Sequence, residues 1–257
     1  EKDLCYLHYK ILTPEQIDKA IDKGIYLDSL YEHQKHMSPK NIDHAIDKGK
    51  DLNVLYYYYQ HHKLTPEHID KAIDKGRDLD ILYYYQHHKL TPENIDHAID
   101  KGIALNVLYE HNLMPEQIDK AIDKGKYLNS LYISKQLTQE QIAKAIDKGE
   151  ELDTLYSYQK HMSRENIDRA IDKGIALDKL YLYHRNLTPK QIDKAIDKGI
   201  YLDYLYQYLK NMSSENIDHA LDKGEELKYL YFNHKLSSKQ IDKAMDIGKD
   251  LGYLYCQ

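Results

Sequence analysis

Apolar residues recur along the whole chain as two short clusters on either side of a glycine. In one copy the first cluster is Ile69, Ala72 and Ile73, and this i, i+3, i+4 spacing places the three side chains on one face of a helix. Gly76 follows, and a Leu-x-x-Leu-Tyr segment begins at Leu79. The pattern therefore predicts two short helices joined by a turn, and the second is expected to be α-helical, 3₁₀ or mixed.

The two-cluster pattern repeats through the sequence, and its glycines give the period. The spacing between successive glycines ranges from 23 residues (Gly102 to Gly125) to 27 residues (Gly49 to Gly76). The length variation falls after the Leu-x-x-Leu-Tyr segment, which is typical of a loop or a helix end. A fixed period of this size is the signature of a repeat array. The glycines are Gly24, Gly49, Gly76, Gly102, Gly125, Gly149, Gly174, Gly199, Gly224 and Gly248.

Each first helix carries its own start and stop signals. Thr65 is a good N-cap, and Pro66 suits the first helical position. His68, which is Gln or Asn in the other copies, stands where a capping box has its second member. Gly76 supplies the left-handed residue that ends the helix. Met114 replaces the Ser or Thr cap in one copy, so we expect that helix to fray more than the others.

Neither helix is long enough to be stable alone, because isolated helices shorter than about 12–15 residues are marginal in water. Each pair must therefore bury its apolar face against the next pair. The fold class we expect is all-α, a right-handed α-solenoid of about ten helix-turn-helix repeats of ~25 residues. We expect a single continuous array over residues 1–257, with a half repeat at 1–11 and ten repeats over 12–257.

The repeat resembles known helical arrays. A Pro-led short helix, a turn and a second short helix are similar to the units of leucine-rich-repeat-variant arrays and of the wider group of HEAT-like α-solenoids. The runs Thr-Pro-Glu-Gln-Ile-Asp-Lys-Ala (13–20) and Thr-Pro-Glu-Asn-Ile-Asp-His-Ala (91–98) also resemble short helical repeats in proteins of bacteriophages and other viruses. The first resemblance implies a solenoid over essentially the whole chain, and the second implies a viral or host-interaction role.

Composition narrows the setting in which we expect the protein to act. The 42 acidic and 36 basic residues give a net charge of −6, which argues against strong nonspecific binding to nucleic acid. No apolar run approaches transmembrane length, so we expect no membrane association. The two cysteines, Cys5 and Cys256, stand near opposite ends of the chain and form no disulfide framework. We expect a soluble, cytoplasmic protein, in the host cytoplasm if it is viral.

Three positions are the same, or nearly so, in every copy, and we expect them to be structural. An aspartate in the last helical turn opposes the helix dipole, so it needs a partner. We expect a ladder in which it accepts from backbone N–H groups of the next helix or from a tyrosine hydroxyl; the alternative is a row of carboxylates facing a cationic partner. The basic residue at the position of Lys71 is expected to pair with Asp70 and Asp74 on its own helix. The ladder residues named in the first four copies are Asp22, Asp47, Asp74 and Asp100 with Tyr31, Tyr56, Tyr83 and Tyr109.

The residues that differ between copies are the better guide to a binding surface. Extra tyrosines and histidines gather in the variable part of two adjacent units, and tyrosine gives large contact area at low entropy cost. We expect these residues to form one partner-binding patch; the alternative is that they only cover the edge of the core. The patch residues are Tyr57, Tyr58, Tyr59, His61, His62, Tyr84, Tyr85, His87 and His88.

The sequence favours a non-enzymatic scaffold that binds another protein. It contains no nucleophile paired with a base and no phosphate-binding glycine loop, and a repeat lacks the single asymmetric site that catalysis needs. The histidines have no metal-ligand spacing, so no metal or other cofactor is expected. The alternative function is a single-stranded nucleic-acid binder that stacks bases on tyrosine.

Overall fold

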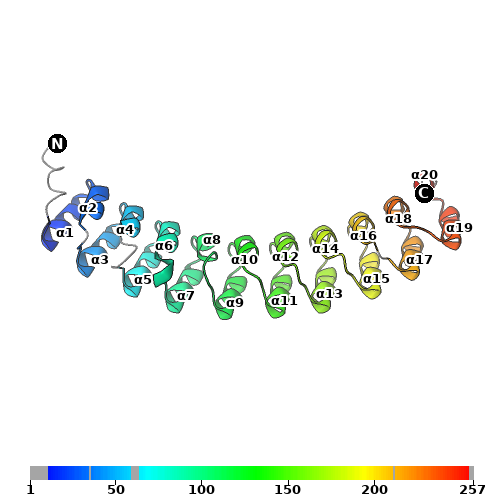
Figure 1. Cartoon of the computed structure of the whole chain (residues 1–257), viewed down its shortest axis with the longest axis horizontal. Coiled ribbons are helices and arrows are strands. Elements are labelled where there is room, and N and C mark those ends of the chain that lie inside the picture. The colour runs from blue at the N-terminus through cyan, green and yellow to red at the C-terminus, as the bar shows by residue number, and fades with distance from the viewer. Residues whose placement is uncertain (1–10, 35, 59–63, 211, 255–257) are drawn as a thin grey trace. The chain divides into compact units, whose positions relative to one another are not determined.

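The computed structural model describes residues 11–34, 36–58, 64–210 and 212–254, in which all regular secondary structure is helical and no β-strand is present. They belong to two compact units, Glu1–Tyr127 and Leu128–Gln257, and each unit is described by itself (Figure 1). Most of the predicted N-terminal half repeat, both cysteines and the patch residues Tyr59, His61 and His62 lie outside the described residues. The prediction of one continuous array over 1–257 stays a prediction.

The first helices have the bounds that the caps indicate. Thr188 shows the usual start: it is extended (φ −72°, ψ 158°), and its side chain accepts from the backbone N–H of Gln191. Met114 offers no such side-chain bond, although the Gln117 side chain still accepts from the Met114 N–H at 3.0 Å. The first helices are α1 (Pro14–Lys23), α3 (Pro39–Lys48), α5 (Pro66–Lys75), α7 (Pro92–Lys101), α9 (Pro115–Lys124), α11 (Gln139–Lys148), α13 (Arg164–Lys173), α15 (Pro189–Lys198), α17 (Ser214–Lys223) and α19 (Ser238–Ile247).

The second helices are α-helical and shorter, and they begin at the first leucine of Leu-x-x-Leu-Tyr. Most of them continue two residues beyond the tyrosine, so part of the variable segment is helical. They are α2 (Leu27–His33), α4 (Leu52–Tyr58), α6 (Leu79–Gln86), α8 (Leu105–Leu108), α10 (Leu128–Ser134), α12 (Leu152–Tyr158), α14 (Leu177–Tyr183), α16 (Leu202–Tyr208), α18 (Leu227–Asn233) and α20 (Leu251–Leu254), with a 3₁₀ turn η1 (His87–Lys89) after α6.

The turn between paired helices contains two left-handed residues, of which the sequence predicted one. Gly174 has φ 73°, as expected, and Ala176 two residues later has φ 53°. An L-residue other than glycine costs roughly 1–2 kcal/mol in this region. The second left-handed residue could not be predicted, because its position holds residues as different as Tyr, Asp, Ala and Glu. They are Tyr26, Asp51, Asp78, Ala104, Tyr127, Glu151, Ala176, Tyr201, Glu226 and Asp250.

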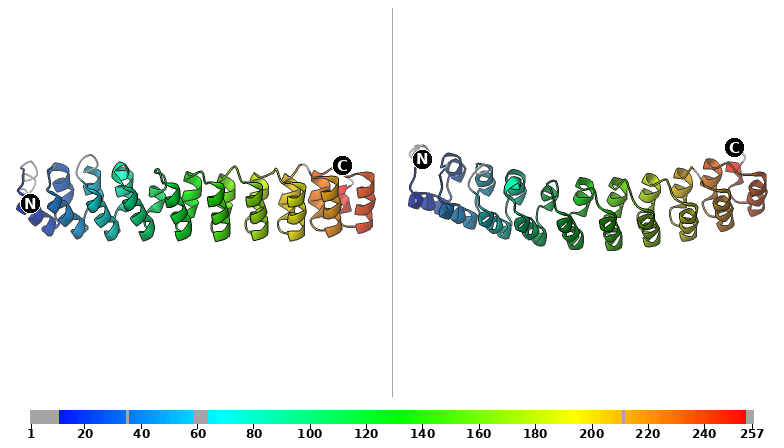
Figure 2. Two further views of the ribbon diagram at one scale, coloured as in Figure 1. Left: turned by 90° about the horizontal axis from the view of Figure 1, so that it is seen from below. Right: turned by 60° about the horizontal axis from the view of Figure 1, so that its bottom comes forward.

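Within each unit the helices pack in series as two rows. In the first unit α1, α3, α5, α7 and α9 pack one against the next, and so do α2, α4, α6 and α8. In the second unit the odd-numbered helices from α11 to α19 form one row, and the even-numbered helices from α10 to α20 form the other. In Figure 1 the first helices of each unit lie along one edge and the second helices along the other, and Figure 2 shows the same rows from two further sides.

The core lies between the two rows, where the predicted apolar positions meet. Ile73, Leu82 and Tyr83 are all fully buried, and the equivalent residues of the other described copies are buried almost without exception. Burial of a leucine or isoleucine side chain contributes about 1.5–3 kcal/mol. Each short helix is therefore stabilised by its neighbours and not by its own length.

The second left-handed residue of the turn can be tested by removing its Cβ atom. We expect Ala176→Gly to stabilise the protein by about 0.5–1 kcal/mol, because glycine relieves a left-handed strain that exceeds its extra unfolded-state entropy. Ala170→Gly, in the buried interior of α13, should instead cost about 1 kcal/mol or more. Denaturant unfolding measures both, and a loss of stability in Ala176→Gly would show that the turn is unstrained.

Candidate functional site

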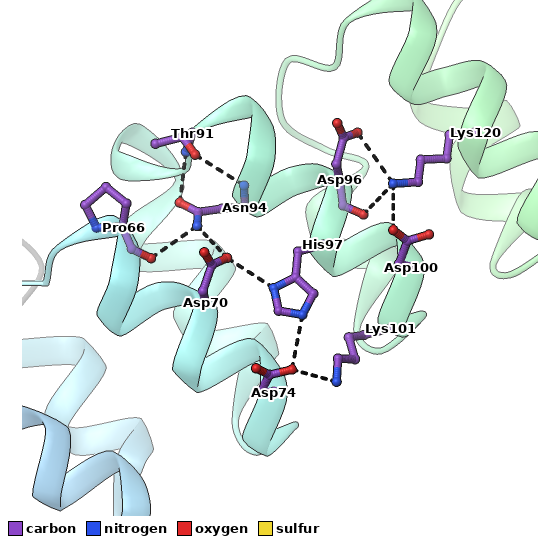
Figure 3. A network of polar contacts seen from close by, with 10 residues as sticks. All are labelled: Pro66, Asp70, Asp74, Thr91, Asn94, Asp96, His97, Asp100, Lys101 and Lys120. Carbon is purple, nitrogen blue, oxygen red and sulfur yellow. Dashed lines mark hydrogen bonds and ion pairs between the residues drawn. The ribbon is translucent and has the colours of Figure 1, made fainter.

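The aspartate in the last turn of most first helices pairs with basic side chains of the next first helix. In α5, Asp74 Oδ1 lies 3.1 Å from His97 Nε2 and 2.6 Å from Lys101 Nζ of α7 (Figure 3). These cations offset the unfavourable placement of a carboxylate at a helix C-terminus. The equivalent pairs are His44 and Lys48 with Asp22, Lys71 and Lys75 with Asp47, Lys120 and Lys124 with Asp100, Arg169 with Asp147, Lys194 with Asp172, His219 and Lys223 with Asp197, and Lys243 with Asp222.

These partners differ from those that the sequence suggested. We expected the aspartate to accept from backbone N–H groups or a tyrosine hydroxyl, and Lys71 to pair within its own helix. Instead Lys71 reaches the preceding helix, 2.7 Å from Asp47, because successive first helices lie side by side. A hydrogen bond from Lys71 holds the pKa of Asp47 below its usual range, and one from Lys101 does the same for Asp74. Half-exposed pairs of this kind contribute little to stability.

A second polar ladder joins the starts of the first helices and is buried. Asn94, 1% exposed, accepts from the Thr91 N–H at 3.1 Å and so completes the cap of α7. Its amide also donates to the Pro66 carbonyl at 3.2 Å and to Asp70 Oδ1 at 2.7 Å, both in α5 (Figure 3). One side chain thus caps its own helix and bonds to the preceding one. The equivalent side chains that donate to the preceding helix are Asn41, His68, Gln117, Asn166, Gln191, Asn216 and Gln240.

A third set of polar side chains, which the sequence analysis missed, serves the second helices. Gln86 and Gln159 donate to the carbonyls of Tyr56 and Tyr132, near the C-terminal ends of the preceding second helices, at 2.9 and 2.8 Å. His184 and His234 do the same for Tyr156 and Tyr206, and burial lowers the pKa of both histidines. The available signal was a Gln or His three residues after the tyrosine of Leu-x-x-Leu-Tyr.

The predicted ladder tyrosines are buried, but their hydroxyl groups are not equivalent. The hydroxyl of Tyr109 donates to the Lys126 carbonyl at 3.2 Å, and that of Tyr31 to the Lys50 carbonyl at 3.5 Å. The hydroxyl oxygens of Tyr56 and Tyr83 are buried with no hydrogen-bond partner among the described residues. Burial raises the pKa of Tyr56, Tyr83 and Tyr109 well above the usual range, so all three stay neutral. The aromatic ring, and not the hydroxyl, is the shared structural element.

The described tyrosines of the predicted patch lie together on the outer face of α4 and α6. Their rings pack edge to face, with centroids 4.9 Å apart for Tyr57 and Tyr58, 5.1 Å for Tyr57 and Tyr85, and 4.9 Å for Tyr84 and Tyr85. Tyr57, Tyr58 and Tyr84 remain 43–59% exposed. We call these four residues the aromatic patch, and its rings are held in place before any partner arrives.

A groove of about 390 Å³ runs along the aromatic patch across α2, α4 and α6. Two of its lining residues are the carboxylates Asp28 and Glu32, which the sequence analysis did not single out, because only packing places α2 beside the tyrosines. The residues that line this acidic aromatic groove are Asp28, Glu32, Asn53, Val54, Tyr57, Tyr58, Ile81 and Tyr85.

The predicted histidines lie beside the patch, in η1. His87 and His88 are exposed, and the His87 ring stacks on that of His111 with centroids 4.7 Å apart. The His87 Nδ1 atom lies 3.0 Å from the Tyr84 carbonyl. In the described ranges, no group of three or more His, Cys, Asp or Glu side chains is arranged to hold a metal ion.

No protein-family model matches the sequence, and no curated protein is similar enough to count as a relative. The resemblance to leucine-rich-repeat-variant and HEAT-like arrays, and to viral repeat proteins, therefore stays a prediction. No helix in the described part of the chain is long and apolar enough to span a bilayer.

The contrast between tyrosine hydroxyls can be tested with one pair of substitutions. We expect Tyr83→Phe to be neutral or to stabilise the protein by about 1 kcal/mol, because it removes a buried hydroxyl without a described partner. Tyr109→Phe should cost about 0.5–1.5 kcal/mol, since it breaks the bond to the Lys126 carbonyl. Chemical denaturation measures both, and equal losses would show that the Tyr83 hydroxyl also has a bonding partner.

Proposed function

We propose that this protein is a non-enzymatic repeat scaffold that binds another protein through the aromatic patch. In this proposal the chain is a right-handed α-solenoid of about ten ~25-residue repeats, continuous over residues 1–257. The serial packing of helices within each unit and the recurring caps support the repeat architecture. A scaffold of this kind offers a long row of second-helix surfaces that vary without disturbing the core.

The observation that carries the proposal is the exposed and ordered state of the patch tyrosines. Large aromatic side chains are enriched among residues that dominate binding energy. The ring contacts among Tyr57, Tyr58 and Tyr85 fix their orientation, so little side-chain entropy is lost when a partner docks. The charged side chains of the first helices, in contrast, already pair with those of neighbouring first helices. The patch is therefore the surface best suited to recognition.

A single-stranded nucleic-acid binder is the alternative, because exposed tyrosines also stack on bases. The carboxylates of Asp28 and Glu32 beside the aromatic patch disfavour it, since they repel phosphate groups. A salt titration separates the two functions: binding through many phosphates weakens steeply as salt rises, and docking that rests mainly on tyrosine rings weakens far less.

One form of the proposal is a viral protein that blocks or sequesters a host factor in the host cytoplasm. It is supported by the resemblance of the Thr-Pro-Glu runs to viral helical repeats and by nothing in the geometry. A broad search for host binding partners tests it, and a search that returned none would contradict it.

The role of the aromatic patch can be tested by affinity capture of the full chain from a lysate of its source or host, with and without nuclease. We expect Tyr58→Ala/Tyr85→Ala to reduce recovery of a stoichiometric protein by about tenfold or more, as loss of central aromatic contacts does. Tyr158→Ala/Tyr183→Ala is the matched control, because these tyrosines occupy the same repeat position in α12 and α14 and are, like Tyr58, about half exposed.

The control should change recovery by less than about twofold, the effect expected of residues outside an interface core. Equal losses in both double variants would contradict the assignment of the patch as the docking surface. Recovery that collapses on nuclease treatment would instead favour the nucleic-acid alternative.

A further inference from the structure

The acidic aromatic groove crosses three second helices obliquely. Asp28 and Glu32 lie one helical turn apart on α2, and Ile81 and Tyr85 lie one turn apart on α6. Counted from the first leucine of each helix, the α2 pair stands one position earlier than the α6 pair. The groove therefore has an acidic end on α2 and an apolar, aromatic end on α6. Its volume of about 390 Å³ fits one or two long side chains better than a folded surface.

The two carboxylates act on the tyrosines of the groove. The Glu32 carboxylate lies close enough to the Tyr58 hydroxyl to act on its pKa, which links the acidic end to the aromatic patch. Partial burial, followed by the charges of Glu32 and Asp28, raises the pKa of Tyr58. Both carboxylates are exposed. The groove thus combines negative charge with the electron-rich faces of tyrosine rings, and both attract a cation.

The groove differs from the comparable surface of the second unit in the cations that its described lining residues supply. There, Arg185 lies over the Tyr208 ring at 5.3 Å, and Lys228 lies over the Tyr229 ring at 4.9 Å. Lys179, at the repeat position of Val54, pairs with Asp178 at 3.5 Å. Among the described residues that line the groove, no Lys or Arg is present. The nearest charge partner in the described residues is His33, 3.8 Å from Glu32.

We propose that the acidic aromatic groove receives a lysine or arginine side chain from a basic segment of a protein partner. This inference rests on the proposed function and names the chemistry of the partner. The cation takes the place over the tyrosine rings that Arg185 and Lys228 take elsewhere in the chain, and its charge is neutralised by Asp28 and Glu32. The aliphatic stem of the side chain packs against Val54 and Ile81.

The test uses the full chain and a fluorescein-labelled hexa-arginine peptide as the probe, read by fluorescence anisotropy at near-physiological salt. Asp28→Asn/Glu32→Gln should weaken binding by about tenfold, as loss of close charge partners does. The control, Asp153→Asn/Glu151→Gln, removes the same amount of charge at the start of α12, where both side chains are exposed. It should weaken binding by less than about twofold, because it changes only the net charge of the protein and no contact in the groove.

Tyr85→Leu keeps apolar bulk and removes the aromatic ring. It should weaken hexa-arginine binding by about two- to fivefold, the loss expected of one cation–π contact at an exposed site. A hexaglutamine peptide should not bind. Far-ultraviolet circular dichroism and thermal unfolding check that each variant remains folded.

Equal weakening by the two charge-removing double variants would overturn the inference, because the peptide would then be held by the net negative charge. Absence of hexa-arginine binding at millimolar peptide would overturn it as well. Partner capture that depends on Tyr58 and Tyr85 but not on Asp28 and Glu32 would refute the cation and leave the proposed function standing. Capture that depends on neither pair would refute the proposed function itself.

Discussion

The structure depends on a polar constraint that short helices impose. A helix of seven or ten residues cannot itself bond the N–H groups of its first turn or the C=O groups of its last turn, and these are about four of each. Asn94 and its equivalents bond the N-cap N–H of their own helix and also donate to a first-turn carbonyl of the preceding helix. In the second row, Gln86 and His184 donate to carbonyls near the C-terminal ends of the preceding helices. The hydrogen bonds that stabilise the ends of a helix therefore also join it to the preceding helix of its row.

This arrangement separates the residues that hold the stack from those that vary on its surface. Buried positions such as Ile73, Leu82 and Tyr83 carry the packing. On the outer faces of the second helices the sequence changes from Asp28 and Glu32 in α2 to Asn53 and Tyr57 at the same positions of α4. A groove with its own chemistry can thus arise on a scaffold whose core does not change.

The helices and their caps could be predicted because their signals are local. Thr65, Pro66 and Gly76 indicate where a helix begins and ends, and the spacing of the leucines indicates which helix face is buried. What could not be predicted depends on neighbours about 25 residues away. The basic partners of Asp74 and the nearness of Asp28 to Tyr58 follow only from the packing of one repeat against the next. The left-handed conformation at Ala176 was missed for a different reason, since no residue preference marks it.

The most direct test of this account is the unfolding free energy of Asn94→Asp beside that of Gln16→Glu. Aspartate keeps the acceptor that caps α7 but replaces the amide that donates to the Pro66 carbonyl and to Asp70. The account predicts a loss of about 2 kcal/mol or more, because a buried carboxylate would face two acceptors. Gln16, exposed at the equivalent position of α1, makes the capping bonds, so Gln16→Glu should be neutral or slightly stabilising. A neutral Asn94→Asp would contradict the account, since the side chain would then serve only as a cap.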